Sequence, residues 1–229
     1  MTLTILIPTH NEEGRIGVTL RKLNAFLKKS KLRASVLVVD DGNDRTAFIS
    51  RSLGAKVIHF PKRLGKGDGV HAGLKQAKGD VVVYDADAST PPEEIPRLVA
   101  ALSNADVAIG SRYSPASNAQ MPLSRKITGR SFNLLVRVLF GMPFSDTQCG
   151  FKAIREKANA RIAPQLRETG FVWDVEFLAI AIRNGMRIEE VPIRWKHVTG
   201  GPTAAGGIIG LLKTALRMLS DVVALRLRL

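Results

Sequence analysis

Cysteine is almost absent from this chain. Its 229 residues include a single cysteine, Cys149, so no disulfide can form within the chain and a zinc site built on cysteines is disfavoured. A chain without disulfides is typical of a reducing compartment. A nucleophilic cysteine needs a partner histidine, and the four histidines show no paired spacing. We therefore interpret Cys149 as a residue that packs in the core or lines a site.

Long hydrophobic runs are missing as well. A membrane-spanning helix needs about 18 or more apolar residues in a row, and no uncharged segment of this sequence reaches that length. The first residues lack the basic and apolar regions of a signal peptide, so no secretion signal is expected. Hydrophobic residues make up 45% and charged residues 24% of the chain, a balance that is typical of folded proteins and excludes a disordered one.

Acidic residues are scarce relative to basic ones. The chain has 34 Lys and Arg against 20 Asp and Glu, which gives a formal net charge of +14. This excess indicates an anionic partner: nucleic acid, an anionic membrane surface or a phosphorylated substrate. Nucleic-acid-binding domains interleave aromatic and basic residues, but aromatic residues are only 6% of this chain and show no such pattern. A basic nucleic-acid-binding domain is therefore the weaker alternative, and no nucleic-acid partner is expected.

Strand-like and helix-like segments alternate along the first half of the chain. Short apolar runs predict strands at residues 3–7, 35–39, 56–60, 80–84 and 105–109. Apolar residues at helical spacing predict helices at 12–29, 46–53, 67–78 and 92–103. This alternation predicts an α/β fold with a Rossmann-like, mostly parallel central sheet flanked by helices.

The second half of the chain is less regular. It predicts helices at 124–139 and 173–183, a strand at 187–193 and a glycine-rich loop at 197–207. No internal repeat or linker divides the sequence, so we expect a single domain over residues 1–229.

Polar side chains gather where the predicted strands end. In chain order they are Asn11, Glu12, Asp40, Asp41, Asp85, Asp87 and Arg112. Ligands of open α/β sheets bind at the carboxyl ends of the strands. Four polar clusters at four strand ends therefore predict one site of the nucleotide-binding type.

The segment Asp85-Ala86-Asp87 carries the most specific chemistry. Two carboxylates that flank one residue can share a divalent cation, and Mg²⁺ or Mn²⁺ prefers such oxygen ligands together with substrate phosphates. The cation would neutralise a diphosphate and stabilise it as a leaving group. The alternative is a solvated surface turn, which the preceding apolar strand disfavours because two like charges beside it need a cation.

Two further segments are candidates for a nucleotide site. Asp40 and Asp41 follow a strand and can accept hydrogen bonds from ribose hydroxyls or from a base N–H, although Asp-Asp-Gly is also a common turn sequence. The segment 8–12 follows the first strand, and there Asn11 could simply cap the next helix.

Several of these segments are motifs of a known family. They are Ile7-Pro8-x-x-Asn11-Glu12, Val38-Val39-Asp40-Asp41-Gly42, Gly65-Lys66-Gly67, Asp85-Ala86-Asp87 and Gly110-Ser111-Arg112. In these motifs, and along essentially its whole length, the chain resembles inverting glycosyltransferases of family 2 with the GT-A fold. The runs 146–152, 173–176 and 190–195 are similar to those of polyprenyl-phosphate sugar synthases, above all dolichyl-phosphate β-glucosyltransferases and then dolichyl-phosphate mannose synthases.

The resemblance implies a metal-dependent transfer of glucose or mannose from a nucleoside-diphosphate sugar, UDP-glucose or GDP-mannose, to a polyisoprenyl phosphate. Mg²⁺ or Mn²⁺ is the expected cofactor. A non-lipid acceptor, either a polysaccharide or a protein glycan, is the alternative within the family. The base, the sugar, the isoprenoid length and the oligomeric state stay open.

The resemblance also assigns roles to individual residues. Asp85 and Asp87 would bind the metal, and Asp146, Asp87 and Arg112 would be catalytic. The residues expected to bind the nucleotide sugar or the acceptor phosphate are Pro8, His10, Asn11, Glu12, Asp40, Asp41, Lys66, Asp85, Ala86, Arg125, Arg130 and Gln148.

An acceptor phosphate is largely dianionic at neutral pH because its second pKa is near 6, so it needs little help from a base. It needs cations instead, for which Arg112, Arg125, Lys126 and Arg130 are candidates. The alternative for those at 125–130 is a solvated helix face. Asp146 is then either a base or a group that orients the acceptor.

The sequence departs from the family pattern in several places that bear on the site. Asp41-Gly42-Asn43-Asp44 stands where the family more often has Gly-Ser-x-Asp. His10 stands where relatives often have Tyr, and Gly200-Gly201-Pro202-Thr203 replaces the usual Gly-Ser-Lys near the acceptor phosphate. Trp173 and Trp195 are interpreted as core residues rather than platforms for a sugar.

Three parts are expected within the single domain: a nucleotide-sugar half at 1–112, an acceptor half at 113–203 and an amphipathic C-terminal helix at 204–229. In that helix Lys213, Arg217 and Asp221 recur every four residues and so share one face of an otherwise apolar helix. Such a helix either lies on a membrane or packs on the protein's own core. With a lipid acceptor, we expect peripheral contact with the cytoplasmic face of a membrane.

Overall fold

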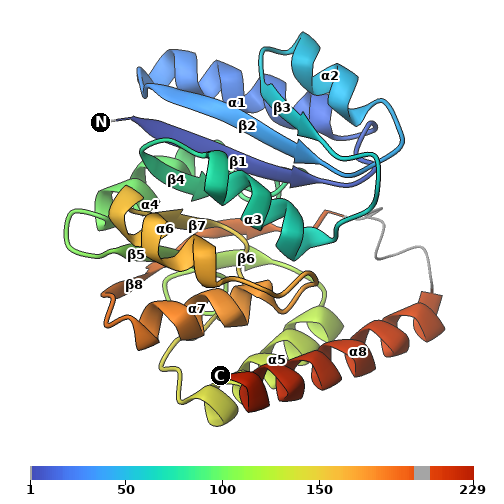
Figure 1. Cartoon of the computed structure of the whole chain (residues 1–229), viewed down its shortest axis with the longest axis vertical. Coiled ribbons are helices and arrows are strands. Elements are labelled where there is room, and N and C mark those ends of the chain that lie inside the picture. Colours follow the sequence, from blue (N-terminus) through green and yellow to red (C-terminus); the bar gives the residue numbers. More distant parts are fainter. Residues whose placement is uncertain (1, 199–206) are drawn as a thin grey trace.

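A mixed seven-stranded sheet forms the centre of the molecule (Figure 1). The structure is a computed structural model that describes residues 2–198 and 207–229, with side chains described up to residue 198 and again from residue 217. The strand order is β3-β2-β1-β4-β7-β5-β8. The bounds are β1 Leu3–Thr9, β2 Ala34–Asp40, β3 Lys56–His59, β4 Asp80–Val83, β5 Val107–Ser111, β7 Lys152–Ile154 and β8 Ile188–Pro192. A separate parallel pair joins β6 (Asn118–Gln120) to β9 (Arg194–Lys196).

Helices cover both faces of the sheet. Their bounds are α1 Ile16–Ser30, α2 Thr46–Ser52, α3 Lys66–Gln76, α4 Ile95–Ala101, α5 Leu123–Phe140, α6 Glu156–Ile162, α7 Trp173–Arg183 and α8 Gly207–Arg228, with short 3₁₀ turns at Pro92–Glu94 and Ala163–Gln165. Successive side chains of β1 point to opposite faces. Ile5 and Ile7 accordingly pack in the core beneath α1 and α4, and Leu6 packs in the core beneath α3, α6 and α7.

The α/β fold expected from the sequence is confirmed. The six expected strands form with ends that shift by no more than two residues, and each predicted helix is present, although the one at 92–103 begins as a 3₁₀ turn. The sequence analysis missed β7, which pairs antiparallel with both β4 and β5. Only three residues long, β7 is too short to give a periodic signal. Through β7 and β8 the second half of the chain contributes to the same sheet as the first.

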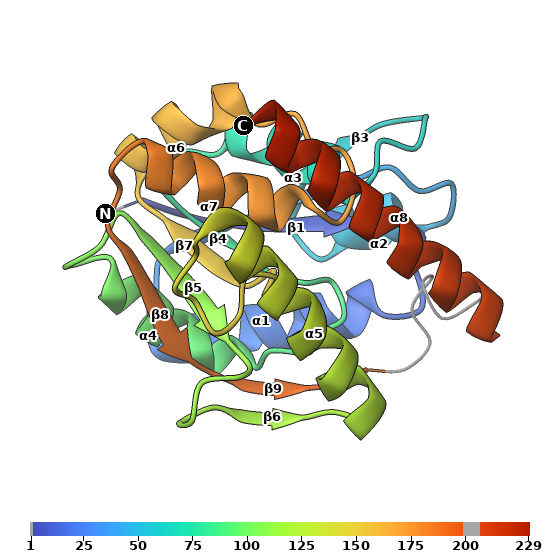
Figure 2. The ribbon, with the colours of Figure 1, turned by 90° about the horizontal axis from the view of Figure 1, so that it is seen from below.

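The C-terminal helix α8 packs on the core with one side and is exposed on the other. Figures 1 and 2 show it beside α5. Val222 and Leu225 are fully buried, whereas the side chains of Leu219 and Val223 are 43% and 45% exposed and Leu227 is 84% exposed. Among the described residues, no helix combines the length and the hydropathy that crossing a membrane requires. Both interpretations of an amphipathic helix therefore keep support, each from a different face of α8.

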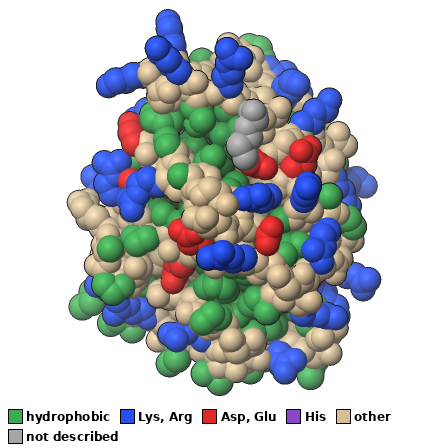
Figure 3. Space-filling model, turned by 90° about the vertical axis from the view of Figure 1, so that its left-hand side faces the viewer, with side chains coloured by type: hydrophobic (Ala, Val, Ile, Leu, Met, Phe, Trp, Pro, Cys, Tyr) green, Lys and Arg blue, Asp and Glu red, His purple; other side chains and the backbone are tan. Residues whose placement is uncertain are grey.

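The basic residues are spread over the surface that Figure 3 shows, with acidic side chains among them. That face therefore carries no continuous basic surface of the kind that binds a nucleic-acid backbone.

Leu225 and Leu227, two of the leucines of α8, test whether the helix belongs to the core. We expect Leu225→Ala to lower the free energy of unfolding by about 2–5 kcal/mol, because the substitution opens a cavity in a packed interior. Leu227→Ala makes the same chemical change on the exposed side and should stay within about 0.5 kcal/mol of the wild type. Urea unfolding measures both values, and equal effects would show that α8 is not docked as described.

Candidate active site

A cavity of about 660 Å³ opens at the carboxyl ends of β1 and β2. Four segments line it: the chain after β1 and β2, the start of α3, residues 169–171, and α8. From the predicted site, the cavity includes Pro8, His10, Glu12, Asp41 and Lys66. This is the edge of the sheet where the sequence analysis expected a nucleotide.

Asp40 and Asp41 are adjacent in sequence but differ in their surroundings. Asp40 is fully buried. Its Oδ1 accepts a hydrogen bond from Thr9 Oγ1 at 2.8 Å, and its Oδ2 lies 3.0 Å from His59 Nδ1. Asp41 lines the cavity, and its Oδ2 accepts the backbone N–H groups of Leu64 and Gly65 at 2.7 and 2.9 Å. Its Oδ1 lies 2.9 Å from His10 Nδ1. Of the two, only Asp41 is placed to meet a ligand in the cavity.

Asn11 and Glu12 shape the loop after β1. Asn11 adopts a left-handed backbone conformation with φ of 53°, and its Oδ1 accepts the N–H of Asn43 at 2.9 Å. It is exposed and ties the loops after β1 and β2 together. Glu12 forms a bidentate pair with Arg15 at 2.7 and 2.6 Å. Burial raises the pKa of Glu12 above its ordinary value in spite of that pairing.

Residues 168–169 pass close to the motif Gly65-Lys66-Gly67, which explains its two glycines. The N–H of Gly67 donates to the carbonyl of Thr169 at 2.8 Å. A Cβ on Gly67 would lie 1.9 Å from the carbonyl oxygen of Glu168, and one on Gly65 would lie 2.5 Å from that of Thr169. Gly65 also has φ of 101°, which disfavours any side chain. The two glycines therefore let residues from the second half close one wall of the cavity.

The two carboxylates of Asp85-Ala86-Asp87 follow the end of β4, the strand next to β1 in the sheet. Asp85 Oδ1 accepts a hydrogen bond from Lys66 Nζ at 3.0 Å, and Asp87 Oδ1 accepts the N–H of Ser89 at 2.9 Å. The carbonyl of Ala86 accepts the hydroxyl of Thr19 at 2.6 Å. Burial opposes ionisation of Asp85, but the charge and hydrogen bond of Lys66, together with the charges of Arg112 and Lys152, hold the pKa of that carboxyl below its ordinary value.

This pair fits a divalent cation that a substrate helps to coordinate. Both carboxylates are only half-buried, and in the described part of the chain nothing hydrogen-bonds to their Oδ2 atoms. The described residues hold no cluster of three or more acidic, His or Cys side chains able to bind a metal. Two carboxylates completed by substrate phosphates are the usual arrangement for Mg²⁺.

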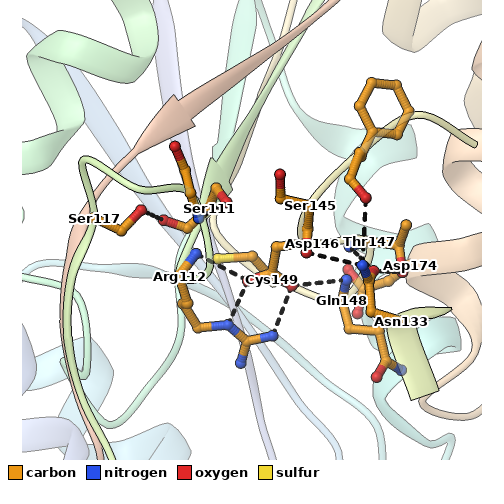
Figure 4. A network of polar contacts seen from close by, with 12 residues as sticks. Ser111, Arg112, Ser117, Asn133, Ser145, Asp146, Thr147, Gln148, Cys149 and Asp174 are labelled. Atoms are coloured by element: carbon orange, nitrogen blue, oxygen red, sulfur yellow. Dashed lines mark hydrogen bonds and ion pairs between the residues drawn. The ribbon is translucent and has the colours of Figure 1, made fainter. Parts of the chain in front are cut away.

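Arg112, which directly follows β5, forms a buried ion pair with Asp146 (Figure 4). Arg112 donates to Asp146 through Nε at 2.7 Å, Nη2 at 2.9 Å and the backbone N–H at 3.0 Å. The N–H of Gln148 donates a fourth bond at 3.2 Å. Burial alone would raise the pKa of Asp146, but Arg112 outweighs it and keeps this pKa below its ordinary value. Four donors around a carboxylate that is 1% exposed favour its ionised form.

The loop that carries Asp146 is fixed from two directions. Asn133 of α5 accepts hydrogen bonds from the N–H and the hydroxyl of Thr147 at 2.8 and 2.7 Å (Figure 4). Glu190 of β8 accepts the N–H of Asp146 at 2.9 Å. Cys149 in this loop is buried, and burial raises the pKa of its thiol to about 12. Cys149 is therefore a packing residue and not a nucleophile.

Three arginines gather around two aromatic rings. The guanidinium carbons of Arg112 and Arg125 each lie 5.6 Å from the centroid of the Trp195 ring. Those of Arg112 and Arg130 lie 5.4 and 5.8 Å from the Tyr113 ring. Burial and then the charge of Arg112 lower the pKa of Arg125. The arginine cluster, as we call Arg112, Arg125 and Arg130, thus brings like charges together and would be stabilised by an anion.

Sequence reasoning missed several residues that support this site. Lys152 of β7 is fully buried and donates to Asp174 at 2.5 Å, and its place at the end of the motif run 146–152 was the signal for it. Asp174 and Glu176 both prove to be interior partners of cations. Trp173 is a core residue, as expected, and Trp195 is buried but also supports the arginines. The segment Gly200-Gly201-Pro202-Thr203 and the side chain of Lys213 lie outside the described residues.

Solved structures define the class to which this fold belongs. The chain is similar to glucosyl-3-phosphoglycerate synthase from Mycobacterium tuberculosis with a TM-score of 0.72 and 18% sequence identity, over 96% of this chain and 79% of that one. That structure was solved in complex with Mn²⁺, UDP and glucosyl-3-phosphoglycerate. The likeness shows the GT-A glycosyltransferase fold.

The sequence comparison narrows the class to a family. Residues 4–162 match Glycosyl transferase family 2, and the chain belongs to that family. It is 31% identical to dolichyl-phosphate β-glucosyltransferase from Saccharomyces cerevisiae, over 98% of this chain and 74% of that protein. It is 32% identical to undecaprenyl-phosphate mannosyltransferase from Micrococcus luteus, over 92% of this chain and 90% of that protein. The resemblance to polyprenyl-phosphate sugar synthases is thereby confirmed.

A third relative is much longer than this chain. Glycosyltransferase AglD from Haloferax volcanii is 32% identical over 85% of this chain, and the chain spans only 33% of its length.

The pair of Arg112 and Asp146 can be tested by a double-mutant cycle. Asp146→Ala leaves a buried guanidinium without its anion and should cost about 3–5 kcal/mol of the free energy of unfolding. Arg112→Ala leaves the carboxylate unpaired and should cost a similar amount. The double variant removes both charges, so its cost should fall well below the sum of the two. Urea unfolding measures the cycle, and additive costs would show that the two side chains do not act as a pair.

Proposed function

We propose that this protein is a metal-dependent inverting glycosyltransferase. It would move a hexose, glucose or mannose, from a nucleoside-diphosphate sugar to a polyisoprenyl phosphate. The donor would be UDP-glucose or GDP-mannose. The relatives named for transfer to dolichyl phosphate or undecaprenyl phosphate support this proposal, since they cover most of the chain.

The observation that carries the proposal is the position of the arginine cluster. Arg125 shares the Trp195 ring with Arg112. The charges of Asp87 and Asp85 act against the lowering of the pKa of Arg125 by burial and by Arg112. Cations that repel one another beside the two carboxylates would receive a dianionic acceptor phosphate next to the donor diphosphate. Arginine suits this task because its planar fork binds two phosphate oxygens at once.

The chemistry asks little of a general base. The acceptor phosphate is largely dianionic near neutral pH and can attack the anomeric carbon directly. Asp146 holds Arg112 in place through two side-chain hydrogen bonds and stays ionised, because its pKa lies below the ordinary value. We assign Asp146 the orienting role of the two that the sequence left open. Gln148 would complete this side of the site.

On the donor side, Asp41 would hold the nucleoside, with Pro8, His10 and Glu12 along the same wall. Asp85 and Asp87 would hold the Mg²⁺ or Mn²⁺, which would neutralise the diphosphate as it leaves. Lys66 lies beside Asp85 and would add a second positive charge there.

Removal of the metal or of its ligands should stop transfer. Asp87→Asn keeps the size of the side chain but removes a charged ligand, so activity should fall by about a hundredfold or more. Chelation with EDTA should do the same to the wild type, and added Mg²⁺ or Mn²⁺ should restore it. Asp68→Asn is the matched control, since Asp68 lies outside the cavity lining.

The measurement is transfer of labelled hexose from UDP-glucose or GDP-mannose to polyprenyl phosphate. Full activity in EDTA would exclude the metal role. Transfer to polysaccharide or protein but not to the lipid would establish the non-lipid alternative instead.

We also propose peripheral contact with the cytoplasmic face of a membrane. Helix α5 exposes a stripe of large apolar side chains, Leu123, Ile127, Leu134 and Val138, at spacings that place them on one face. The neighbouring α8 adds Leu219, Val223 and Leu227. The α5–α8 surface, as we call these seven residues, is bordered by basic side chains of α5. An apolar face with a basic border is typical of helices that lie in a membrane interface.

A lipid acceptor makes this contact useful. An isoprenoid tail leaves the bilayer at a cost of about 0.8 kcal/mol for each exposed CH₂ group, so the enzyme has to come to the lipid. Deleting α8 would be a poor test, because Val222 and Leu225 belong to the core. Substitutions on the exposed side of α5 avoid that problem.

We therefore expect Leu134→Glu with Val138→Glu to weaken binding to vesicles that contain anionic lipid by about tenfold or more, since each charge near such a surface counts about 1 kcal/mol. The control is Val18→Glu with Phe48→Glu, which changes two exposed apolar residues on α1 and α2 in the same way. Vesicle sedimentation measures binding. Equal binding by the two double variants would rule out the α5–α8 surface as the membrane contact.

A further inference from the structure

Helix α8 reaches the donor cavity. Arg217, Met218 and Asp221, from the middle of the helix, line the same space as Asp41 and Lys66. Nothing in the sequence pattern indicates this, because Arg217 follows Lys66 by 151 residues in the chain. A helix expected to serve a membrane or the core therefore also forms part of the wall around the proposed nucleotide site.

A buried carboxylate, that of Glu176, holds α8 in place as part of the cavity wall. Arg228 at the end of α8 donates to Glu176 at 2.6 Å and lies 2.9 Å from Glu168. The other oxygen of Glu176, which is 1% exposed, accepts the N–H groups of Arg167 and Glu168 at 2.9 and 2.7 Å. One carboxylate thus fixes both α8 and the segment that leads into residues 169–171. These two elements face the cavity together.

The cavity contains cations with different degrees of pairing. Lys66 is bound to Asp85 at 3.0 Å. Among the side chains that the structure describes, Arg217 has one loose partner, Asp221 of its own helix, at 3.9 Å, and its side chain is 80% exposed. A guanidinium held this loosely keeps most of its donors available to an anionic ligand. Asp221 limits the directions in which Arg217 can point, because the two lie four residues apart on α8.

We propose that α8 is part of the donor site and that Arg217 donates hydrogen bonds to the bound nucleoside diphosphate. Met218 and Phe171, which is 41% exposed, supply apolar contact to the nucleoside from the same side. Pro8 and Asp41 face it from the strand ends. The inference rests on the proposed function, because a nucleoside diphosphate is the ligand that the function requires. It adds a binding group from a helix that the family motifs do not include.

The test is the binding of UDP and GDP to the full chain, measured by calorimetry with Mg²⁺ present and with neither vesicles nor acceptor. Arg217→Ala should raise the Kd of the nucleotide that binds by about tenfold, the ratio that the loss of one charge-assisted hydrogen bond produces. Arg217→Lys should retain part of the affinity, because it keeps the charge but not the fork. The matched control is Arg226→Ala, the same change at an exposed position of α8 that does not line the cavity.

The outcomes separate this inference from the proposed function. Asp41→Ala should weaken binding through the other wall of the cavity whatever α8 does. If Arg217→Ala binds as tightly as Arg226→Ala while Asp41→Ala is impaired, α8 is not part of the donor site and the inference is wrong. If the wild type binds neither nucleotide, the proposed function itself is wrong and the inference falls with it. Arg217 is mostly exposed, so its removal should leave the urea unfolding curve unchanged.

Discussion

A carboxylate that is buried away from water must pair with a cation or accept hydrogen bonds from N–H groups, and the arrangement of the whole site depends on this requirement. Asp146 pairs with Arg112, Asp85 with Lys66, Asp174 with Lys152 and Glu176 with Arg228. In each pair the two partners come from different elements, so each pair also joins distant parts of the chain. Two of these pairs, Arg112 with Asp146 and Lys66 with Asp85, lie at the carboxyl ends of β5 and β4. The cations that stabilise buried anions are thereby gathered where anionic substrates would bind.

The sequence predicts what depends on local pattern. The strands that end in Asp40, Val83 and Ser111 follow from apolar runs, and the polar residues after them identify the ligand-binding edge. The pairing of residues far apart in sequence does not follow from such patterns. No periodicity distinguishes Asp40, which is fully buried, from Asp41, which lines the cavity. The same holds for β7, for the partner of Lys152, and for the passage of residues 168–169 over Gly67, all of which depend on tertiary contacts.

Helix α8 shows how one amphipathic pattern can serve several surfaces. Some of its apolar side chains are buried in the core, others are exposed, and Arg217, Met218 and Asp221 line the cavity. A helix has room for three such stripes because successive residues are turned by about 100°. The two interpretations of α8, a membrane helix and a core helix, therefore concern different side chains of the same helix. They do not compete for all of them.

The placement of β7 has a consequence for how the chain folds during synthesis. Strand β5 pairs only with β7 and β8, so a nascent chain that ends at residue 112 contains β5 with no neighbour in the sheet. Strand β4 would likewise present an unpaired edge until residues 152–154 emerge from the ribosome. The donor-side strands thus have to wait for some 40 further residues, and contacts of such long range slow folding. For this reason a fragment cut at residue 112 would be aggregation-prone and would not fold as a separate nucleotide-binding unit.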